Sequence, residues 1–336
     1  MTHSISAQAT HTNTHQVAAS LKTQAGSPKP DISKSNKRKS KAQKITKKPV
    51  FDMYQEVTNQ MIEALENGVK PWVCPWKTSG GFGSLPVNCQ SKKAYSGINI
   101  LLLWAAASKL GFTSSYWLTF KQALEVGANV RKGEKGTRIV FYKMLEVEDK
   151  NTGEKDNIPM LKSFVVFNAD QIDGLEIEPE TTNDDITPFE AIEHVESFIS
   201  ATGANITEQG DKAYFRPSTD DVVLPSRERF TNNLDFYCTA LHELTHWTGA
   251  KHRLDRIKKS RFGTDEYAFE ELIAELGASF LMADLNISGE VQHESYIASW
   301  LKQLKNDKRY IFKAASAASK AHQYLIEKTT EQQKAA

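Results

Sequence analysis

The chain of 336 residues has few cysteines and no long apolar segment, and both absences exclude classes of protein. The cysteines Cys74, Cys89 and Cys238 form no CxxC pair, and so sparse and odd a set argues against a disulfide framework. No apolar run approaches the roughly 20 residues that cross a bilayer. Residues 1–30 also lack the apolar core of a secretion signal. We therefore expect a cytoplasmic protein that does not enter a membrane.

Charge is distributed unevenly, although the net charge is only +1. Residues 1–49 contain ten Lys or Arg against a single acid, and residues 70–143 contain 11 basic side chains against two acids. Residues 175–336 instead contain 18 basic and 27 acidic side chains, a net charge of −9. This distribution is expected if the first half contacts a polyanion and the second half has another task.

The length predicts two domains, each large enough for its own core. Residues 1–49 have almost no large apolar side chains, so they cannot offset the entropy of ordering and are predicted to be a disordered basic tail. Residues 50–174 form the first predicted domain, and residues 175–186 an acidic linker. The second domain covers residues 187–336 and starts at a capping box with Pro188 at the first helical position.

The predicted fold class is α+β, because helical and strand patterns occur in both domains. In the first domain, helices around residues 54–65 and 100–110 are followed by strands over 137–142 and 164–168. The second domain is predicted to be mainly helical with a small sheet. Its short strands cover residues 213–217 and 221–225, and further helices are expected over 188–201, 265–285, 295–304 and 308–327.

Aromatic and basic side chains are interleaved in the first domain, where four of the six tryptophans lie between Trp72 and Trp117. A groove for single-stranded nucleic acid needs rings that stack on bases and cations that contact phosphates. Core packing of the tryptophans and a solvated basic face are the alternatives. The residues predicted to bind single-stranded DNA are Trp72, Trp76, Lys77, Lys92, Lys93, Tyr95, Asn99, Trp117, Lys121, Arg131, Lys132, Lys135 and Arg138.

A metal-binding motif, H-E-x-x-H, starts at His242 inside a predicted helix that Gly249 ends by adopting a left-handed conformation. His242 and His246 are four residues apart and share a helix face, so both imidazoles can bind one Zn²⁺ per chain. Glu243 then lies where it can accept a proton from metal-bound water. A chance match on a solvated helix is the alternative, but the capped helical context favours the metal motif.

A catalytic zinc has three protein ligands and one open position, so a further ligand is required. His252 completes the metzincin spacing H-E-x-x-H-x-x-G-x-x-H, but Met282 lies in a helical segment and not in the turn which that class requires. Glu271 and Glu275 share a face of a downstream helix, so Glu271 can bind the metal while Glu275 accepts a hydrogen bond from a ligand histidine. Glu271 is therefore favoured, with His252 and then Glu270 as alternatives.

Several longer strings resemble the ArdC-type antirestriction proteins of conjugative plasmids, and the first half is also similar to a region of certain plasmid primases. The strings occupy residues 86–88, 95–99, 117–123, 130–136, 167–168, 224–230, 242–249 and 270–276. The resemblance implies a single-stranded DNA-binding domain followed by a zincin-like metallopeptidase domain, which together protect incoming plasmid DNA from restriction. It also implies that Glu243 is the general base and that His242, His246 and Glu271 bind the metal.

The leading hypothesis is an antirestriction protein that binds single-stranded DNA without sequence preference and carries a zinc-dependent peptidase site. The alternative is a protein that coats DNA or blocks a restriction enzyme and whose metal site is structural. A primase is disfavoured, because the sequence shows no acidic cluster of the kind that nucleotide polymerisation needs. The expected partners are single-stranded DNA and a restriction enzyme or another protein substrate; no oligomeric state is predicted.

Overall fold

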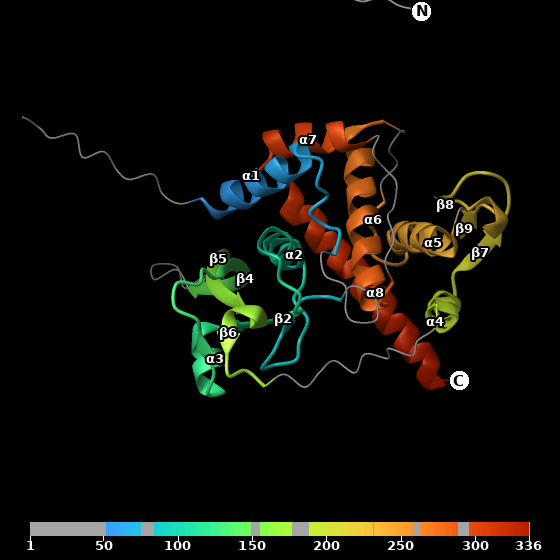
Figure 1. Cartoon of the computed structure of the whole chain (residues 1–336). Helices are drawn as coiled ribbons and strands as arrows, with labels where there is room; N and C mark the ends of the chain where they lie inside the picture. The colour runs from blue at the N-terminus through green and yellow to red at the C-terminus, as the bar shows by residue number, and fades with distance from the viewer. Residues whose placement is uncertain are drawn as a thin grey trace, which may run out of the picture. The chain divides into compact units, whose positions relative to one another are not determined.

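The computed structural model describes residues 52–74, 84–148, 155–176, 188–230, 232–257, 263–287 and 296–335. Phe51–Ala336 clusters as one compact unit, and Met1–Val50 as another. The basic tail predicted for residues 1–49 lies outside the described residues. Helices and short strands alternate along the second unit (Figure 1), which confirms the mixed α+β class. Within the described ranges, no helix combines the length and apolar character needed to cross a membrane.

The unit begins with α1 (Met53–Glu66), which forms where the sequence predicts a helix. The Asp52 carboxylate caps its start by accepting backbone N–H groups of the first turn. Val57, Met61 and Leu65 recur at helical spacing and are buried, so this face of α1 joins the hydrophobic core.

A four-stranded sheet with the order β1-β2-β5-β4 lies against the apolar helix α2 (Ile98–Leu110). The strands are β1 (Val87–Asn88), β2 (Tyr116–Thr119), β4 (Thr137–Glu148) and β5 (Lys155–Asn168). β1 and β2 are parallel, whereas β2 with β5 and β4 with β5 are antiparallel. The short elements α3 (Phe120–Glu125), β3 (Asn129–Val130), η1 (Ala169–Gln171) and β6 (Ile172–Asp173) complete this part of the chain.

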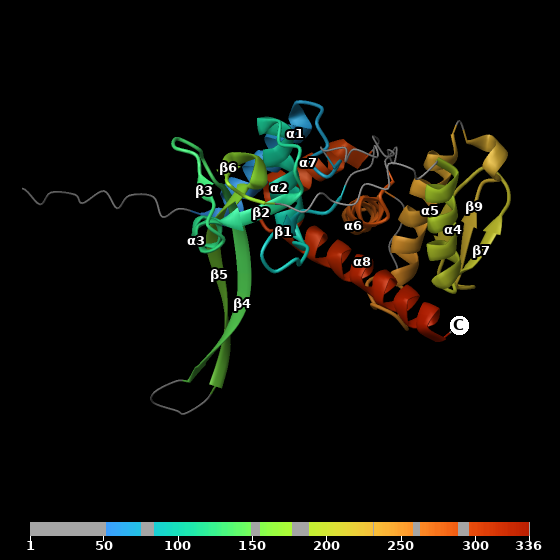
Figure 2. The same cartoon turned by 60° about the horizontal axis from the view of Figure 1, so that its bottom comes forward.

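Strands β4 and β5 form a long hairpin that extends well beyond the shorter strands (Figure 2). Its base is tied to α2 through Asn99, whose side chain accepts the Val140 N–H at 2.9 Å and donates to the Val140 carbonyl at 2.8 Å. The sequence predicts strand only for residues 137–142 and 164–168, so the hairpin is longer than expected. The Asn99 contact fixes the hairpin relative to the helix behind it.

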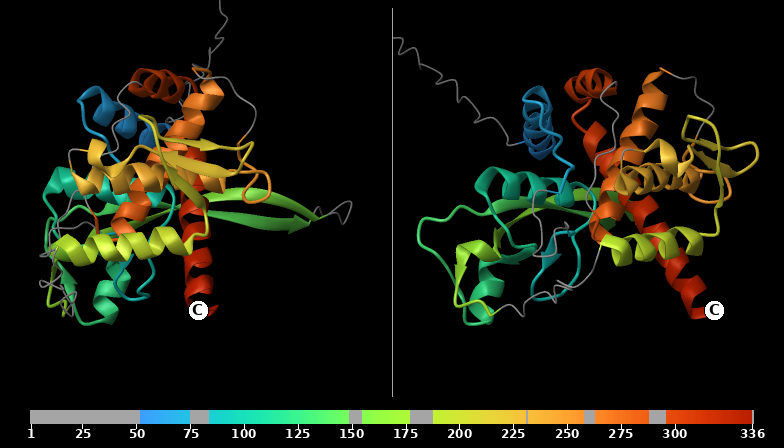
Figure 3. Two further views of the ribbon diagram at one scale, coloured as in Figure 1. Left: turned by 90° about the vertical axis from the view of Figure 1, so that its right-hand side faces the viewer. Right: turned by 45° about the vertical axis from the view of Figure 1, so that its right-hand side comes forward.

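The second part combines five helices with a small sheet of order β7-β9-β8 in its described residues. The strands are β7 (Asn205–Glu208), β8 (Tyr214–Arg216) and β9 (Asp221–Leu224), followed by η2 (Arg227–Arg229). The helices are α4 (Pro188–Ala201), α5 (Asn233–Thr248), α6 (Asp265–Asp284), α7 (Ile297–Asn306) and α8 (Tyr310–Ala335). Figure 3 shows the sheet beside α5, which contacts β8 and β9. The predicted strands are confirmed as β8 and β9, whereas β7 was not predicted.

The largest buried cluster draws side chains from both parts of the unit. The Trp72 ring packs edge-on against Trp300 of α7 with centroids 5.6 Å apart, and Trp104 of α2 packs against Phe280 of α6 at 6.0 Å. A second cluster lies among α4, β9, α5 and the other side of α6. The first cluster is therefore shared between the two parts, because residues of α6, α7 and α8 pack in it together with residues of α1 and α2, whereas the second cluster belongs to the second part alone. The domain limits remain a prediction, and most of the predicted linker lies outside the described residues.

Candidate functional site

Helix α5 carries both histidines of the H-E-x-x-H motif. It begins after Asn232, whose side chain accepts the Asp235 N–H at 2.9 Å. The rings of His242 and His246 lie 4.8 Å apart between centroids, and the side chains are buried. The predicted left-handed conformation of Gly249 is wrong, since its φ is −77°. Glycine fits there for another reason: a Cβ at this position would lie 2.7 Å from Ile257 Cγ1.

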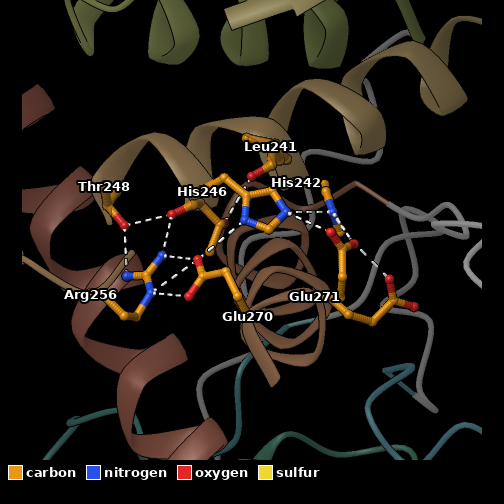
Figure 4. A network of polar contacts seen from close by, with 9 residues as sticks. Leu241, His242, His246, Thr248, Arg256, Glu270 and Glu271 are labelled. Carbon is orange, nitrogen blue, oxygen red and sulfur yellow. Dashed lines mark hydrogen bonds and ion pairs between the residues drawn. The ribbon is translucent and has the colours of Figure 1, made fainter. Parts of the chain in front are cut away.

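Helix α6 approaches α5 closely enough to bring a carboxylate to these histidines. A Cβ on Gly277 would lie 2.5 Å from Cγ2 of Thr245 on α5, so only glycine permits the observed spacing. Glu271 lies less than two turns before Gly277, and its side chain points toward His242 and His246 (Figure 4). Gly277 thus permits the close contact between α5 and α6.

Three potential ligand atoms from His242, His246 and Glu271 converge at one point. The two Nε2 atoms of the histidines are 3.2 Å apart. Glu271 Oε2 lies 3.5 Å from His242 Nε2, and Glu271 Oε1 lies 3.6 Å from His246 Nε2. Ligands bound tetrahedrally to zinc at about 2.1 Å are separated by roughly 3.4 Å. The three spacings therefore fit one zinc-sized cation.

His246 is held from its other side by Glu270 and Arg256 (Figure 4). Its Nδ1 lies 3.2 Å from Glu270 Oε1, and Arg256 donates to both Glu270 oxygens at 2.8 and 2.9 Å. Burial opposes the charged imidazole, but the Glu270 bond and the nearby carboxylates raise the pKa of His246 to about 9. Glu270, predicted as an alternative ligand, thus orients a candidate ligand histidine in the way carboxylates do around metal sites.

His242 is flanked by a second carboxylate. Glu275 Oε2 lies 4.0 Å from His242 Nδ1, while Glu275 Oε1 accepts the indole N–H of Trp72 at 3.3 Å. Glu275 therefore lies behind a histidine, one turn along α6 from Glu271, but at 4.0 Å the predicted hydrogen bond with His242 is not formed. Each histidine has its Nε2 toward the shared point and its Nδ1 toward a carboxylate of α6.

The charge state of Glu271 follows from these neighbours. Burial favours its protonated form, but the hydrogen bond with His242 and the charges of His246 and His242 lower its pKa to about 2. The Tyr267 hydroxyl also donates to Glu271, and burial together with the Glu271 charge raises the pKa of Tyr267. The cluster thus concentrates negative charge around two histidines, which suits a cation.

The cluster opens into a cavity of about 940 Å³. Glu243 is also buried and lines this cavity together with His242, His246 and Glu271. Aromatic residues from β8, α6, α7 and α8 form much of the remaining wall: Tyr214, Phe215, Tyr267, Phe269, Tyr296 and Tyr310. A carboxylate beside three potential metal ligands, in a cavity large enough for a side chain, can perform acid–base chemistry on a bound substrate.

The structure separates His252 from this cluster. Its side chain is 62% exposed, and its Nε2 pairs with Asp220 Oδ2 at 3.2 Å. Met282 is part of α6 and contacts Cys238, so it forms no turn beneath the site. The metzincin alternative is therefore wrong for this conformation. The H-x-x-G-x-x-H spacing matches the metzincin string by coincidence, because the chain leaves α5 at Gly249 and carries His252 away from His242 and His246.

Of the three tryptophans predicted to stack on DNA bases, two are buried and one lies outside the described residues. Trp72 and Trp117 are 1% and 0% exposed, so the prediction that their rings stack on bases is contradicted by their burial. Asn99 binds the backbone of β4 as described above, and Tyr95 is half-buried with its hydroxyl 3.3 Å from Asn88 Nδ2. Trp76 and Lys77 lie outside the described residues.

The predicted basic residues are mostly at the surface. Lys92, Lys93, Lys121, Arg131, Lys132, Lys135 and Arg138 are all exposed. Lys121 pairs with Glu125 at 3.4 Å, and Arg131 pairs with Glu134 and Asp173 at 3.3 Å each. Such exposed ion pairs are weak, so these cations can exchange an acidic partner for a phosphate.

Exposed aromatic residues of the hairpin were not predicted. Phe141, Tyr142 and Phe164 are 51%, 58% and 46% exposed, and the Phe141 and Phe164 rings meet edge-on at 6.3 Å. Phe141 pairs across the strands with exposed Lys162. The sequence signal that could have revealed these residues is the alternation of side chains along a strand, which puts Phe141 on the face opposite to Val140.

Comparisons with known proteins agree with this organisation. Residues 51–167 match the family described as the N-terminal domain of anti-restriction factor ArdC, and residues 193–317 match the zincin-like metallopeptidase family. A metal-free crystal structure of the antirestriction ArdC protein from plasmid R388 is 42% identical, with a TM-score of 0.72 over 84% of this chain and 99% of that one. Its Mn(II)-bound structure is 41% identical, with a TM-score of 0.69 over 83% of this chain and 98% of that one.

Curated relatives extend the comparison. The uncharacterized protein y4eC of Sinorhizobium fredii is 41% identical over 283 residues, which cover 82% of this chain and 91% of that protein. Two DNA primases TraC of Escherichia coli are each 38% identical over 83% of this chain, but the match spans only 20% and 27% of the primases. The chain therefore belongs to the family of ArdC antirestriction proteins, with an ArdC N-terminal domain followed by a zincin-like metallopeptidase domain.

Proposed function

We propose that this protein protects DNA entering a cell during conjugation by binding single strands and by hydrolysing peptide bonds at a zinc centre. The observation that carries the peptidase proposal is the convergence of His242, His246 and Glu271 at 3.2 to 3.6 Å beside the cavity-lining Glu243. Two imidazoles and a carboxylate form a donor set typical of catalytic zinc. The R388 relative has a Mn(II)-bound structure, which supports binding of a divalent metal by this chain.

In the proposed reaction, His242, His246 and Glu271 hold one Zn²⁺, and the cavity admits a peptide. When bound, zinc supplies Lewis-acid polarisation of the scissile carbonyl and lowers the pKa of a water molecule. Glu243 accepts the proton of the attacking water and delivers it to the leaving amine. Glu270 and Glu275 keep the two imidazoles oriented, because each lies at an Nδ1 atom.

For the DNA-binding function we propose the exposed face of the β4–β5 hairpin together with nearby cations. Phe141 and Phe164 supply rings without a covering element among the described residues, and Lys162, Lys132 and Lys135 supply exposed positive charge. Rings and cations of this kind bind bases and phosphates without sequence preference. The match to the ArdC N-terminal domain supports a role of this part in DNA binding.

A restriction enzyme is the proposed protein substrate, since cleavage of such an enzyme would protect DNA directly. We place this activity in the cytoplasm, where incoming strands meet restriction enzymes. The small and scattered set of three cysteines is typical of a reducing compartment.

The test replaces Glu243 with glutamine, which keeps the size of the side chain but accepts no proton at neutral pH. We expect bound zinc to be retained and peptide cleavage to fall by roughly 10²–10⁴-fold, the usual contribution of a general base. Glu228→Gln, at an exposed site on η2, is the matched control and should cleave normally. Unchanged cleavage by the Glu243→Gln variant would refute the mechanism.

The same variant separates the peptidase from the alternative function. In a conjugation assay with a restricting recipient, the proposal predicts that Glu243→Gln loses protection of the incoming plasmid. Full protection by this variant would instead favour coating of DNA or blocking of the restriction enzyme, with the metal site in a structural role.

A further inference from the structure

Trp72 belongs to the region that matches the ArdC N-terminal domain, yet its side chain ends at the metal cluster of the second part. We propose that Trp72 is a positioning residue for the metal centre, because its indole N–H orients Glu275 and Glu275 in turn orients the His242 imidazole. The inference rests on the proposed function, in that it treats His242 as a metal ligand. It means that the first part of the chain completes the site of the second.

The two oxygens of Glu275 face different partners. Oε1 accepts the Trp72 Nε1–H at 3.3 Å, and Oε2 lies 4.0 Å from His242 Nδ1. The terminal torsion of a glutamate has broad preferences, so an external contact is needed to set the plane of the carboxylate. With Oε1 held by the indole, Oε2 is directed toward the imidazole. An indole N–H only donates, so the role of Trp72 is positional and involves no proton transfer.

Trp72 is itself held rigidly. It is 1% exposed, follows the buried Pro71 and packs edge-on against Trp300 at 5.6 Å. Trp300 is anchored to α6, since its Nε1 donates to the Ala268 carbonyl at 2.8 Å. The donor that reaches Glu275 is therefore fixed relative to the same helix that carries Glu271. A rigid donor of this kind can set the direction of a ligand to within the tolerance that a metal site needs.

Zinc affinity is the quantity that this arrangement should change. Loss of a carboxylate that orients a ligand histidine typically lowers metal affinity 10–100-fold. Trp72 acts one bond further from the metal, so we expect Trp72→Phe to weaken zinc binding by roughly threefold to tenfold. Phenylalanine keeps an aromatic ring against Trp300 and removes the N–H.

The experiment measures the zinc dissociation constant of the full-length protein by competition with a chromophoric chelator. Trp104→Phe is the matched control, because Trp104 is equally buried and packs on α6 through Phe280, but its N–H donates to Ser84 O at 3.4 Å. We expect the control to bind zinc within about twofold of the parent protein. In a Glu275→Ala background, Trp72→Phe should cause no further loss. Equal losses in the Trp72 and Trp104 variants, or a full additional loss without Glu275, would overturn the inference.

A second measurement needs no substitution that weakens the fold. In ¹⁵N-labelled protein, the indole N–H signal of Trp72, assigned through its contact with Trp300, should shift when zinc is added, and that of Trp104 should not. A stationary Trp72 signal in protein that binds zinc would reject this inference alone. Failure of the parent protein to bind zinc would reject the proposed function first.

Discussion

Replacing Gly277 with alanine should force α5 and α6 apart beside the candidate metal centre. The added methyl group would lie 2.5 Å from Thr245 Cγ2 and 2.9 Å from Thr245 Oγ1. Thr245 is fully buried, and its hydroxyl donates to the Leu241 carbonyl at 2.9 Å, so it cannot turn away without losing that bond. The clash must therefore be relieved by movement of the helices.

Two opposing effects decide the size of the change in stability. Forcing an extra carbon into a packed core destabilises by roughly 1–3 kcal/mol. Alanine is favoured over glycine inside a helix by about 1 kcal/mol. Because both contacts are shorter than normal van der Waals distances and neither partner is flexible, we expect a net loss of roughly 1–2 kcal/mol in the free energy of unfolding.

The same movement should weaken metal binding. The contacts of Glu271 with His242 and His246, at 3.5 and 3.6 Å, cross from α6 to α5 and would lengthen. The 3.2 Å distance between the two histidines lies within α5 and would not. Zinc affinity should therefore fall in the Gly277→Ala variant even where the protein remains folded.

Urea denaturation of the metal-free protein measures the first effect, with a double-mutant cycle as its control. Thr245→Ala removes both clashing atoms and leaves only Thr245 Cβ, 3.3 Å from the new methyl group. The double variant should therefore recover roughly 1–2 kcal/mol relative to the sum of the single changes. Additive energies, or a Gly277→Ala variant more stable than the parent, would refute the argument that glycine is required for this helix contact.

Three further predictions concern DNA affinity, its salt dependence and acid stability. Phe141→Ala and Phe164→Ala should each weaken binding of a single-stranded oligonucleotide by roughly 1–3 kcal/mol. The control Val69→Ala, at another exposed apolar site, should bind like the parent protein. Equal affinities of all three variants in a fluorescence titration would exclude the hairpin face as the DNA-binding surface. Lys132→Ala and Lys135→Ala should reduce the dependence of log affinity on log salt by about 0.7 for each lost phosphate contact. Asp221 has its pKa lowered from 3.8 to about 2, chiefly because Arg216 donates a hydrogen bond to it, so its contribution to stability is present above pH 3.8 and lost as the pH falls toward 2. Acid unfolding followed by circular dichroism should accordingly be less pH-dependent across that interval in Asp221→Asn, and an unchanged profile would contradict the assignment.

Elements with local signals were predicted well. The apolar positions of α1 are a few residues apart, α4 begins at Pro188 as the sequence predicts, and α6 is expected over 265–285 where it forms as Asp265–Asp284. The sequence does not predict β7, because its four residues form a strand only by pairing with β9. In the sequence, β8 lies between these two strands. The outer half of the hairpin was missed for a similar reason, since β4 and β5 are defined by pairing with each other.

In the candidate metal centre too, residues with a local sequence signal were predicted better than those placed by distant parts of the chain. The spacing of His242 and His246 is a property of one helix, so the sequence was sufficient to predict their convergence. Glu271 was favoured from its face on a second helix, and the observed distances agree with that choice. The neighbouring Glu270 was a poorer prediction, because the sequence does not show that Arg256 holds it against His246 Nδ1. That contact depends on the path of the chain after Gly249.

Trp72 shows that tryptophans and basic residues interleaved in the first domain can serve two different purposes. Basic residues farther along the first domain, such as Lys92 and Lys132, are exposed, whereas the Trp72 ring is buried by α6 and α7, whose residues lie about 200 positions later. Composition cannot distinguish a ring that stacks on a base from one that joins two parts of a core, because both need a large aromatic side chain.

Strand register does distinguish the two kinds of aromatic residue. Phe141 lies opposite Lys162, and Phe164 lies opposite Ile139, so both phenylalanines and one cation share a face of the hairpin. The aromatic residues that we propose to bind DNA are therefore the exposed phenylalanines of the hairpin, whereas the tryptophan is proposed to position the metal centre.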